Sequence, residues 1–171
     1  QSLAINSGYS ERNPGINELY SFGLHQGVSG LEEGTLNLKK EKALKNTLEY
    51  IWYPSSNFSI NTLIYHQSFN GYINLIPKQK ENVNGELVNE IRTTIRGAFP
   101  VFKYQQTNAN IYGFDISSQF STGNSIFGLI KYSFLRGQDV KNKIPLIYMP
   151  PNSIFGSLKY QLKKSKKLNK G

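Results

Sequence analysis

The chain has 171 residues, enough for one domain with its own core. Hydrophobic residues make up 38% of it, below the roughly 45–50% usual in soluble domains. Aromatic residues are abundant, with 11 Tyr and 10 Phe. A soluble β-sandwich needs Val, Ile and Leu to fill its interior, whereas a membrane β-barrel needs one apolar band, aromatic girdles and a polar lumen. The composition therefore favours a barrel.

Charge and cysteine content exclude several classes of site. The absence of cysteine rules out disulfides and cysteine-based metal sites. The net charge is +9, and we interpret the lysine run near the C-terminus as a solvated end, although such a run can also bind nucleic acid or anionic lipid. No stretch of 18 apolar residues predicts a transmembrane helix. The start of the chain lacks a Met and the pattern of a signal peptide, so we expect an internal piece or a processed chain.

Alternating apolar residues predict strands from the N-terminus onward. Leu3, Ile5 and Tyr9 share one face of the first, and a polar stretch of residues 11–40 follows. A second strand is expected over residues 41–53 and ends at the Pro-Ser-Ser-Asn segment. A third begins at residue 58 and can continue through 71–77, before a charged, irregular stretch of residues 78–97.

The C-terminal part repeats this pattern. Residues 99–120 are expected to form one long, bulged strand, and the Ser-Thr-Gly-Asn segment 121–124 turns it into a strand over 125–136. A loop over 137–152 contains Pro145, Pro150 and Pro151, and the last strand is expected over 153–163.

The connections alternate between four-residue turns and loops of about 16 to 30 residues. In an up-and-down sheet every second connection lies at the same end, so all short turns share one end and all long loops the other. Outer-membrane barrels have this arrangement. Six strands leave two unpaired edges, which lipid does not tolerate, so either two strands escape detection or the chain is a fragment.

The strand faces differ in character, most clearly on either side of the turn at 121–124. We expect Tyr112, Phe114 and Ile116 to face lipid, and Tyr132 and Phe134 to lie in an aromatic girdle near the long-loop end. The alternate residues are expected to face a wet lumen: Asp115, Ser117, Gln119 and Lys131.

Three stretches resemble the barrel of TonB-dependent outer-membrane receptors, Bacteroidetes-like members in particular. In the first, residues 8–50, the matching residues are Arg12, Pro14, Glu18, Leu19, Tyr20, His25, Gly27, Glu33, Gly34, Leu38 and Glu41, and Thr35 stands where Asn is usual. In residues 96–115, Gln106 and Ala109 match a Gln-x-x-Ala motif before Gly-Phe-Asp, where Glu is more usual than Asp. In residues 132–160, a Tyr-x-x-x-Arg-Gly strand and a loop ending in Pro-Pro match.

The resemblance implies an all-β fold, with antiparallel up-and-down strands forming part of a large transmembrane β-barrel. It implies a 22-stranded barrel with an N-terminal plug, of which residues 1–171 are a partial barrel domain lacking the plug and TonB box. The implied function is uptake of an iron chelate, siderophore or similar scarce nutrient across the bacterial outer membrane. The implied partners are the TonB complex, outer-membrane lipid and lipopolysaccharide, and the ferric siderophore or other nutrient, with no nucleic acid and no cofactor.

Two alternatives remain open: a small outer-membrane barrel acting as an adhesin or structural protein, and a soluble β-sandwich binding module. A plug domain upstream would separate the receptor from the small barrel. Dependence on detergent would separate both from the soluble module.

The sequence offers no catalytic constellation, so we expect no enzyme. His25, Glu32 and Glu33 have the chemistry of metal ligands, but we favour a structural or solvated role, because they supply only two or three ligands where a metal takes about four. We expect four aromatic residues near the loop end, where they can stack on a cargo or anchor the barrel: Tyr20, Phe22, Tyr72 and Tyr104. Four arginines are expected to cluster there, where they can bind an anionic chelate, lipopolysaccharide phosphates or carboxylates: Arg12, Arg92, Arg96 and Arg136. The candidate ligand-binding residues are Arg12, Tyr20, Phe22, His25, Glu32, Glu33, Tyr72 and Arg96.

Overall fold

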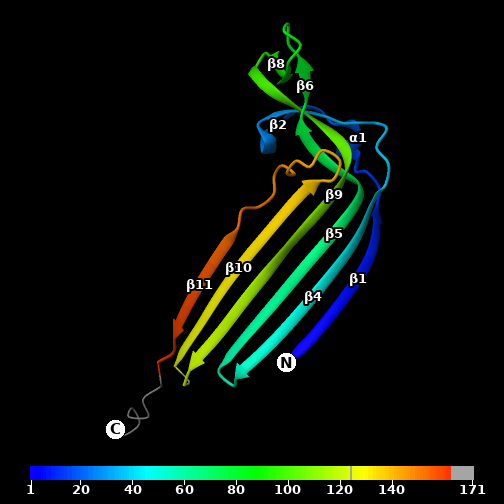
Figure 1. Ribbon diagram of the computed structural model, residues 1–171. Coiled ribbons are helices and arrows are strands. Elements are labelled where there is room, and N and C mark those ends of the chain that lie inside the picture. Colours follow the sequence, from blue (N-terminus) through cyan, green and yellow to red (C-terminus); the bar gives the residue numbers. More distant parts are fainter. Residues whose placement is uncertain (124, 163–171) are drawn as a thin grey trace.

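A single curved antiparallel sheet dominates the computed structural model, which describes residues 1–123 and 125–162. Its six long strands run up and down in the order β1-β4-β5-β9-β10-β11 (Figure 1), which confirms the predicted all-β fold. Their bounds are β1 Ser2–Arg12, β4 Glu41–Ser55, β5 Phe58–Pro77, β9 Gly97–Thr122, β10 Ile126–Asp139 and β11 Ser153–Tyr160.

The connections alternate in length as predicted. Residues 56–57 join β4 to β5 and residues 123–125 join β9 to β10, while the other three connections are long. The short turns are tighter than the four residues predicted, because β4 continues through Pro54 and Ser55 and β9 continues through Ser121 and Thr122. Asn124 of the second turn and the lysine-rich end, residues 163–171, lie outside the described residues.

The two long connections predicted to be irregular contain regular structure. The first holds the short helix α1 (Ile16–Tyr20) and the hairpin of β2 (Phe22–His25) and β3 (Gly30–Glu33). The second holds the hairpin of β6 (Gln79–Glu81) and β7 (Leu87–Asn89), then β8 (Ile91–Thr94). Above the end of β10 one edge of β9 is free, and β3 pairs with it there, while β8 pairs with the other edge of β9 beyond the end of β5. A free edge offers unpaired backbone groups, which explains why these loops form strands.

The predicted bulge lies in β5 and not in β9. Asn70 and Gly71 together face the single residue Asn108 of β9. Gly71 has a φ of 72°, a left-handed conformation that glycine adopts without strain, and its N–H donates to Asn108 Oδ1 at 3.1 Å. The expectation of a bulge in the long strand is therefore wrong in its location, because the glycine belongs to the partner strand.

Register assigns the two faces of the sheet, because directly paired residues share a face. One row across five strands consists of Ile5, Leu48, Ile64, Phe114 and Phe134. The adjacent row on the opposite face consists of Ala4, Glu49, Leu63, Asp115, Ser133 and Ser153. One face is thus apolar and aromatic, and the other is largely polar.

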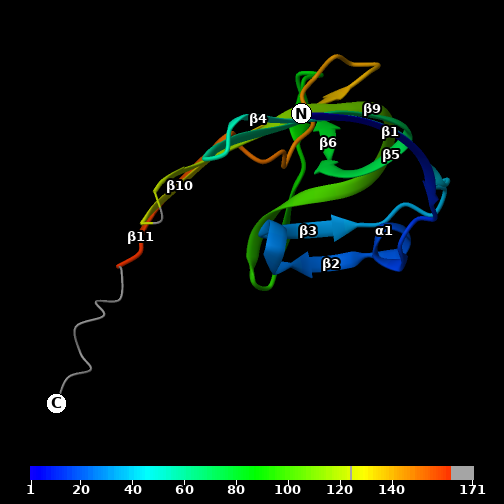
Figure 2. The same cartoon turned by 90° about the horizontal axis from the view of Figure 1, so that it is seen from below.

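The polar face is the concave one. Arg12, on the polar face of β1, pairs with Glu18 of α1, and α1 lies in the hollow of the curved sheet beside β2 and β3 (Figure 2). The apolar face is therefore convex, and we call it the outward face. The small core lies at the loop end and consists of Leu31, Ala43, Ile73, Val101, Phe102, Ala109 and Leu146. In the part of the chain that the structure describes, no helix has the length and apolar character needed to cross a membrane.

Candidate functional site

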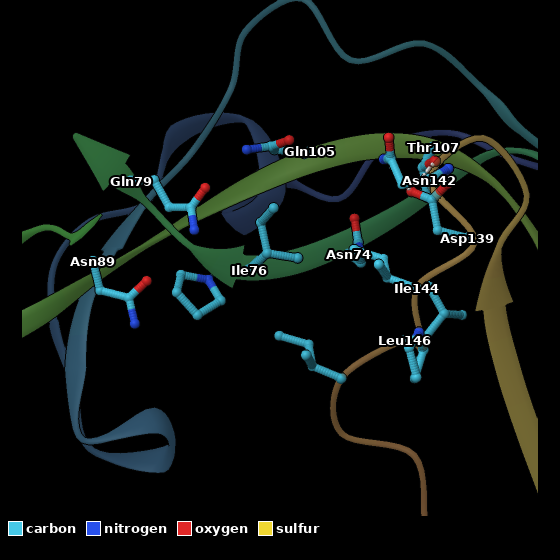
Figure 3. A pocket seen from close by; sticks show the side chains of 13 residues that line it. Asn74, Ile76, Gln79, Asn89, Gln105, Thr107, Asp139, Asn142, Ile144 and Leu146 are labelled. Carbon is cyan, nitrogen blue, oxygen red and sulfur yellow. Dashed lines mark hydrogen bonds between the residues drawn. The ribbon is translucent and has the colours of Figure 1, made fainter. Parts of the chain in front are cut away.

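One candidate site is a cavity of about 280 Å³ at the loop end (Figure 3). It lies between the ends of β5 and β9 and the connection from β10 to β11. Ile76, Ile144 and Leu146 supply apolar surface. The polar side chains are mostly amides: Asn74, Gln79, Asn89, Gln105, Thr107, Asp139 and Asn142.

The bulge brings two walls of this cavity together. Beyond Gly71, β5 and β9 pair Tyr72 with Thr107 and Asn74 with Gln105. Asn74 and Gln105 thus share one face of the sheet and both line the cavity. Asn74 Oδ1 is buried and has no hydrogen-bond partner among the described residues. A buried carbonyl oxygen without a donor is costly, so this atom is suited to accept a hydrogen bond from a ligand.

Asp139 fixes the third wall. Its buried carboxylate accepts hydrogen bonds from Thr107 Oγ1 at 2.6 Å, from the Asn142 N–H at 2.8 Å and from Asn142 Nδ2 at 3.1 Å. Burial acts to raise the pKa of Asp139, but the hydrogen bonds from Thr107 and Asn142 outweigh it and lower the pKa. The Leu146 N–H also donates to Gly137 O at 2.9 Å. The carboxylate therefore stays ionised and holds the connection against β9.

An ion-pair network joins the first two long connections. Glu33 of β3 lies 2.9 Å from Lys78 Nζ and 2.7 Å from Arg92 Nη2, and Glu90 lies 3.2 Å and 2.8 Å from the same two atoms. Burial acts to raise the pKa of Glu33, but hydrogen bonds from Lys78 and Arg92 lower it. We call these four residues the loop network.

A second group ties the first connection to the sheet. Arg12 contacts Glu18 of α1 at 2.8 Å and Glu41 of β4 at 3.2 Å. The hydrogen bond to Glu18 is the main cause of a raised Arg12 pKa. Glu41 also accepts the Ile73 N–H of β5 at 2.8 Å. Arg12 therefore fixes α1 to β1, β4 and β5.

Known structures resemble this fold. The chain matches "Copper transporter OprC" with a TM-score of 0.66 at 18% identity, over 94% of this chain and 22% of that one. It matches the siderophore receptor PirA from Acinetobacter baumannii with a TM-score of 0.59 at 15% identity, over 95% and 24%. It matches the FrpB iron transporter from Neisseria meningitidis with a TM-score of 0.54 at 13% identity, over 95% and 22%.

The chain has the fold of part of these transporter and receptor chains. It spans about a quarter or less of the length of these three structures. The sequence matches no protein-family model and no curated protein. Two of these proteins are named as transporters and one as a receptor, none as an enzyme.

The three predicted metal ligands do not come together in the structure. His25 Nδ1 lies 2.9 Å from Glu32 Oε1, with Glu32 buried and 63% of the His25 side chain exposed. Glu33 points the other way, into the loop network, because consecutive strand residues face opposite sides. No group of three or more His, Cys, Asp or Glu residues within residues 1–123 and 125–162 is placed to hold a metal ion.

The predicted aromatic residues occupy different surroundings. Tyr20 and Phe22 are 66% and 82% exposed on the first connection. Tyr72 packs edge-on against Phe69 with ring centroids 5.0 Å apart, and burial raises its pKa. The Tyr104 hydroxyl accepts a hydrogen bond from Asn17 Nδ2 at 3.4 Å. Tyr20 and Phe22 thus have rings free to stack on a ligand.

The predicted arginine cluster does not form. Arg12 and Arg92 are held by carboxylates in two separate groups. Arg96 is exposed in the turn between β8 and β9. Arg136 lies on the outward face, 4.6 Å from the centroid of the Phe134 ring. The residues share an end of the sheet, but the carboxylates beside two of them and the alternation of strand faces keep them apart.

The candidate ligand residues predicted from sequence therefore lie around the cavity end without lining the cavity. The amides that line it were missed. Residues 104–110, Tyr-Gln-Gln-Thr-Asn-Ala-Asn, are polar in both strand phases, unlike the alternating residues that follow. That break in alternation is the signal that β9 rises above the apolar band, and it could have identified Gln105 and Thr107.

Proposed function

We propose that this chain forms part of the wall of an outer-membrane receptor barrel that takes up a scarce nutrient in a TonB-dependent manner, with an iron chelate such as a siderophore as cargo. The sheet forms about a quarter of the barrel, its concave polar face lines the lumen, and the long connections face the cell exterior. A plug domain in the same polypeptide would couple this wall to the TonB complex.

The outward face carries this proposal. From the row of Ile5, Leu48 and Ile64 down to the short turns, none of its described side chains is Asp, Glu, Lys or Arg. Large apolar side chains on it are uncovered, including Ile5 at 75% and Ile154 at 79% exposure. Such a patch is rare on a monomeric soluble protein and matches a surface that meets lipid.

The strands have the length that a membrane requires. A strand of 14 residues such as β10 is about 45 Å long, and at a tilt of about 40° it crosses an apolar band of about 25 Å. A β-sandwich would need a second sheet over the outward face, and none covers it within the described residues. The stacked rings of Phe114 and Phe134, 5.4 Å apart, and the neighbouring Tyr132 fit the aromatic girdle.

The cavity supports an organic cargo. Its amide side chains can both donate and accept hydrogen bonds, which suits the oxygen-rich groups of a chelator. The names of the similar structures include copper, siderophore and iron. We therefore place the first contact with an iron chelate at Asn74 and Gln105, with Tyr20 and Phe22 as stacking surfaces nearby on the first connection.

Uptake of radiolabelled ferric siderophore by the source bacterium tests the proposal. We expect uptake to require both the native polypeptide and TonB, and Asn74→Ala with Gln105→Ala to weaken binding of the chelate. Gln119→Ala, on the same face next to a short turn, is the matched control. Uptake that continues without TonB, in a polypeptide whose intact mass is near 19.4 kDa, would instead support a small barrel without transport.

A further inference from the structure

Four lysines surround a second hollow at the loop end, of about 580 Å³. Lys39, Lys40 and Lys42 lie where the first connection returns to β4, and Lys141 follows β10. Residues distant in sequence thus bring four positive charges to one place. We call this the lysine hollow.

The backbone around the lysine hollow is fixed by one side chain. Gln106 Nε2 donates to Lys39 O at 2.8 Å and to Gly71 O at 2.9 Å, and its Oε1 accepts the Lys39 N–H at 2.7 Å. On the other side, the Val140 N–H donates to Asn108 O at 2.8 Å, next to Lys141. Hydrogen bonds to the sheet therefore fix the backbone on both sides of the lysine hollow.

The lysine hollow opens on the outward face. Lys42 pairs with Glu11 and Asn70, in phase with Leu44 and Tyr9 of the apolar rows below. A smaller hollow, which Lys42 shares with Tyr9 and Leu44, continues down that face. A ligand in the lysine hollow would therefore lie directly above the band proposed to meet lipid acyl chains.

The charge balance of the lysine hollow favours an anion. Glu11 lies 3.7 Å from both Lys40 Nζ and Lys42 Nζ, and it also accepts the Tyr9 hydroxyl at 2.7 Å. The lining contains four lysines and no acid, and the two nearby carboxylates, Glu11 and Asp139, leave an excess of positive charge. At the short-turn end, the described part of the outward face has no lysine or arginine. Within the described outward face, the excess of positive charge therefore lies only at the long-loop end, where it would face the headgroups of the leaflet on that side.

We propose that the lysine hollow binds the phosphate groups of a lipid headgroup, which in the outer leaflet of an outer membrane is lipopolysaccharide. Lysine stems lie along apolar surface while their ammonium groups reach the headgroup layer, and lysine binds phosphate as a point charge. The side chains of Lys40 and Lys42 are 59% and 50% exposed, so both can turn towards a phosphate. This inference rests on the membrane position given under the proposed function.

The test compares two triple variants of the native polypeptide, purified in detergent. Lys40→Gln, Lys42→Gln and Lys141→Gln remove charge from the lysine hollow. Lys45→Gln, Lys131→Gln and Lys159→Gln remove the same charge from the concave face. Native mass spectrometry with added lipopolysaccharide, phosphatidylcholine or inorganic phosphate gives the affinity for each probe.

We expect the first triple to lose roughly 100-fold in affinity for lipopolysaccharide, since a lysine near an anionic lipid surface contributes about 5-fold. The concave-face triple should bind as the unaltered protein does, and Glu11→Gln should bind more tightly. Equal loss in both triples would overturn the proposal. Inorganic phosphate binding as tightly as lipopolysaccharide would overturn the assignment to a lipid.

The fluorescence of Trp52 distinguishes a failure of the lysine-hollow proposal from a failure of the proposed function. It is the only tryptophan of the chain and lies on the outward face near a short turn. Brominated lipids should quench a fluorescence component that Trp52→Phe removes. If Trp52 is quenched but lipopolysaccharide does not bind selectively, the proposal for the lysine hollow is wrong and the membrane position stands. If Trp52 is not quenched, the membrane position of the outward face is wrong.

Discussion

The two ends of the sheet are held together in different ways. At the loop end, side chains hold the strands and connections together through a small core, three buried acidic residues and the loop network. Towards the short turns, side chains such as Leu158 and Tyr160 stay 73% and 65% exposed, and the strands are joined mainly by backbone ladders. In the proposed membrane, lipid takes the place of a core at the turn end, so the same substitution should act differently at the two ends and on the two faces.

A charge placed in the apolar band should have the largest effect. Ile130 and Leu129 are consecutive in β10 and lie on opposite faces, with Ile130 in the middle of the apolar band and Leu129 paired to Gln119 and Ser157 on the polar face. Ile130→Lys should destabilise the folded barrel by about 2–4 kcal/mol, because the ammonium would lie in the hydrocarbon layer. Leu129→Lys should cost less than about 1 kcal/mol, since its ammonium would lie in the polar lumen. Urea unfolding in lipid vesicles measures both, and equal costs would contradict the assignment of faces.

Overpacking a glycine within the ladder should have the next largest effect. The Tyr65 ring lies over Gly113 and its hydroxyl donates to Phe134 O at 3.3 Å. A Cβ at residue 113 would meet both that carbonyl oxygen and the Tyr65 ring. We expect Gly113→Ala to destabilise the barrel by about 1–3 kcal/mol.

Gly156→Ala is the matched control for this glycine. Gly156 also lies in a long strand, yet no atom lies within 4 Å of an added Cβ. The substitution should be neutral, or stabilise by up to about 1 kcal/mol through loss of freedom in the unfolded chain. If both glycine variants unfold at the same urea concentration, the Tyr65 ring does not pack on residue 113 in the membrane.

Breaking the loop network should have a smaller, local effect. Arg92→Gln removes one of the two cations that join Glu33 to Glu90, so the contact of β3 with the second connection weakens. Surface ion pairs contribute little to global stability, so we expect an unchanged urea midpoint and several-fold faster hydrogen exchange at residues 91–94. Arg96→Gln is the control, because Arg96 makes no ion pair within the described residues. Equal exchange in the two variants would show that the network does not hold the connection.

The same contrast explains what the sequence could predict. Residues 112–120 alternate between apolar and polar, and this two-residue period within one strand is enough to assign its two faces. The structure confirms the six long strands. The loop-end strands β3 and β8 pair through their backbones with the two free edges of β9, and that pairing leaves little pattern in the side chains. The bulge could be attributed to β5 only once its pairing with Asn108 was known.

The candidate site was harder to predict for a related reason. Its walls come from β5, β9 and the connection after β10, which are distant in sequence and meet only through register. Charged residues such as Arg12 and Glu33 were predicted to bind a ligand because charge is visible in the sequence, yet the structure places them in ion pairs. Uncharged amides such as Asn74 carry the cavity wall, and a single amide in a strand has no distinctive spacing.

Acid should loosen the loop end and leave the turn end unchanged. Hydrogen bonds from Arg92 and then Lys78 lower the pKa of Glu90, and the same partners outweigh burial to lower that of Glu33. A carboxyl group with a lowered pKa stabilises above its ordinary value, here 4.5, and that contribution is lost as the pH falls through the lowered pKa. Hydrogen bonds to Glu33 and then Glu90 raise the pKa of Lys78, so its contribution is present below 10.5 and is lost only at a more alkaline pH.

Hydrogen exchange, corrected for intrinsic rates, measures this difference between the ends. Residues 91–94 should stay protected from about pH 5 to pH 10 and exchange faster below about pH 4, as the two carboxylates take up protons. The short turn over residues 55–58 contains no ionisable side chain, so its corrected exchange should not change across that range. In Glu33→Gln the acid-induced step at residues 91–94 should shrink, because one of the two titrating groups is gone. A step of unchanged size in that variant would mean that another group controls the loop end, with buried Asp139 as the first to test.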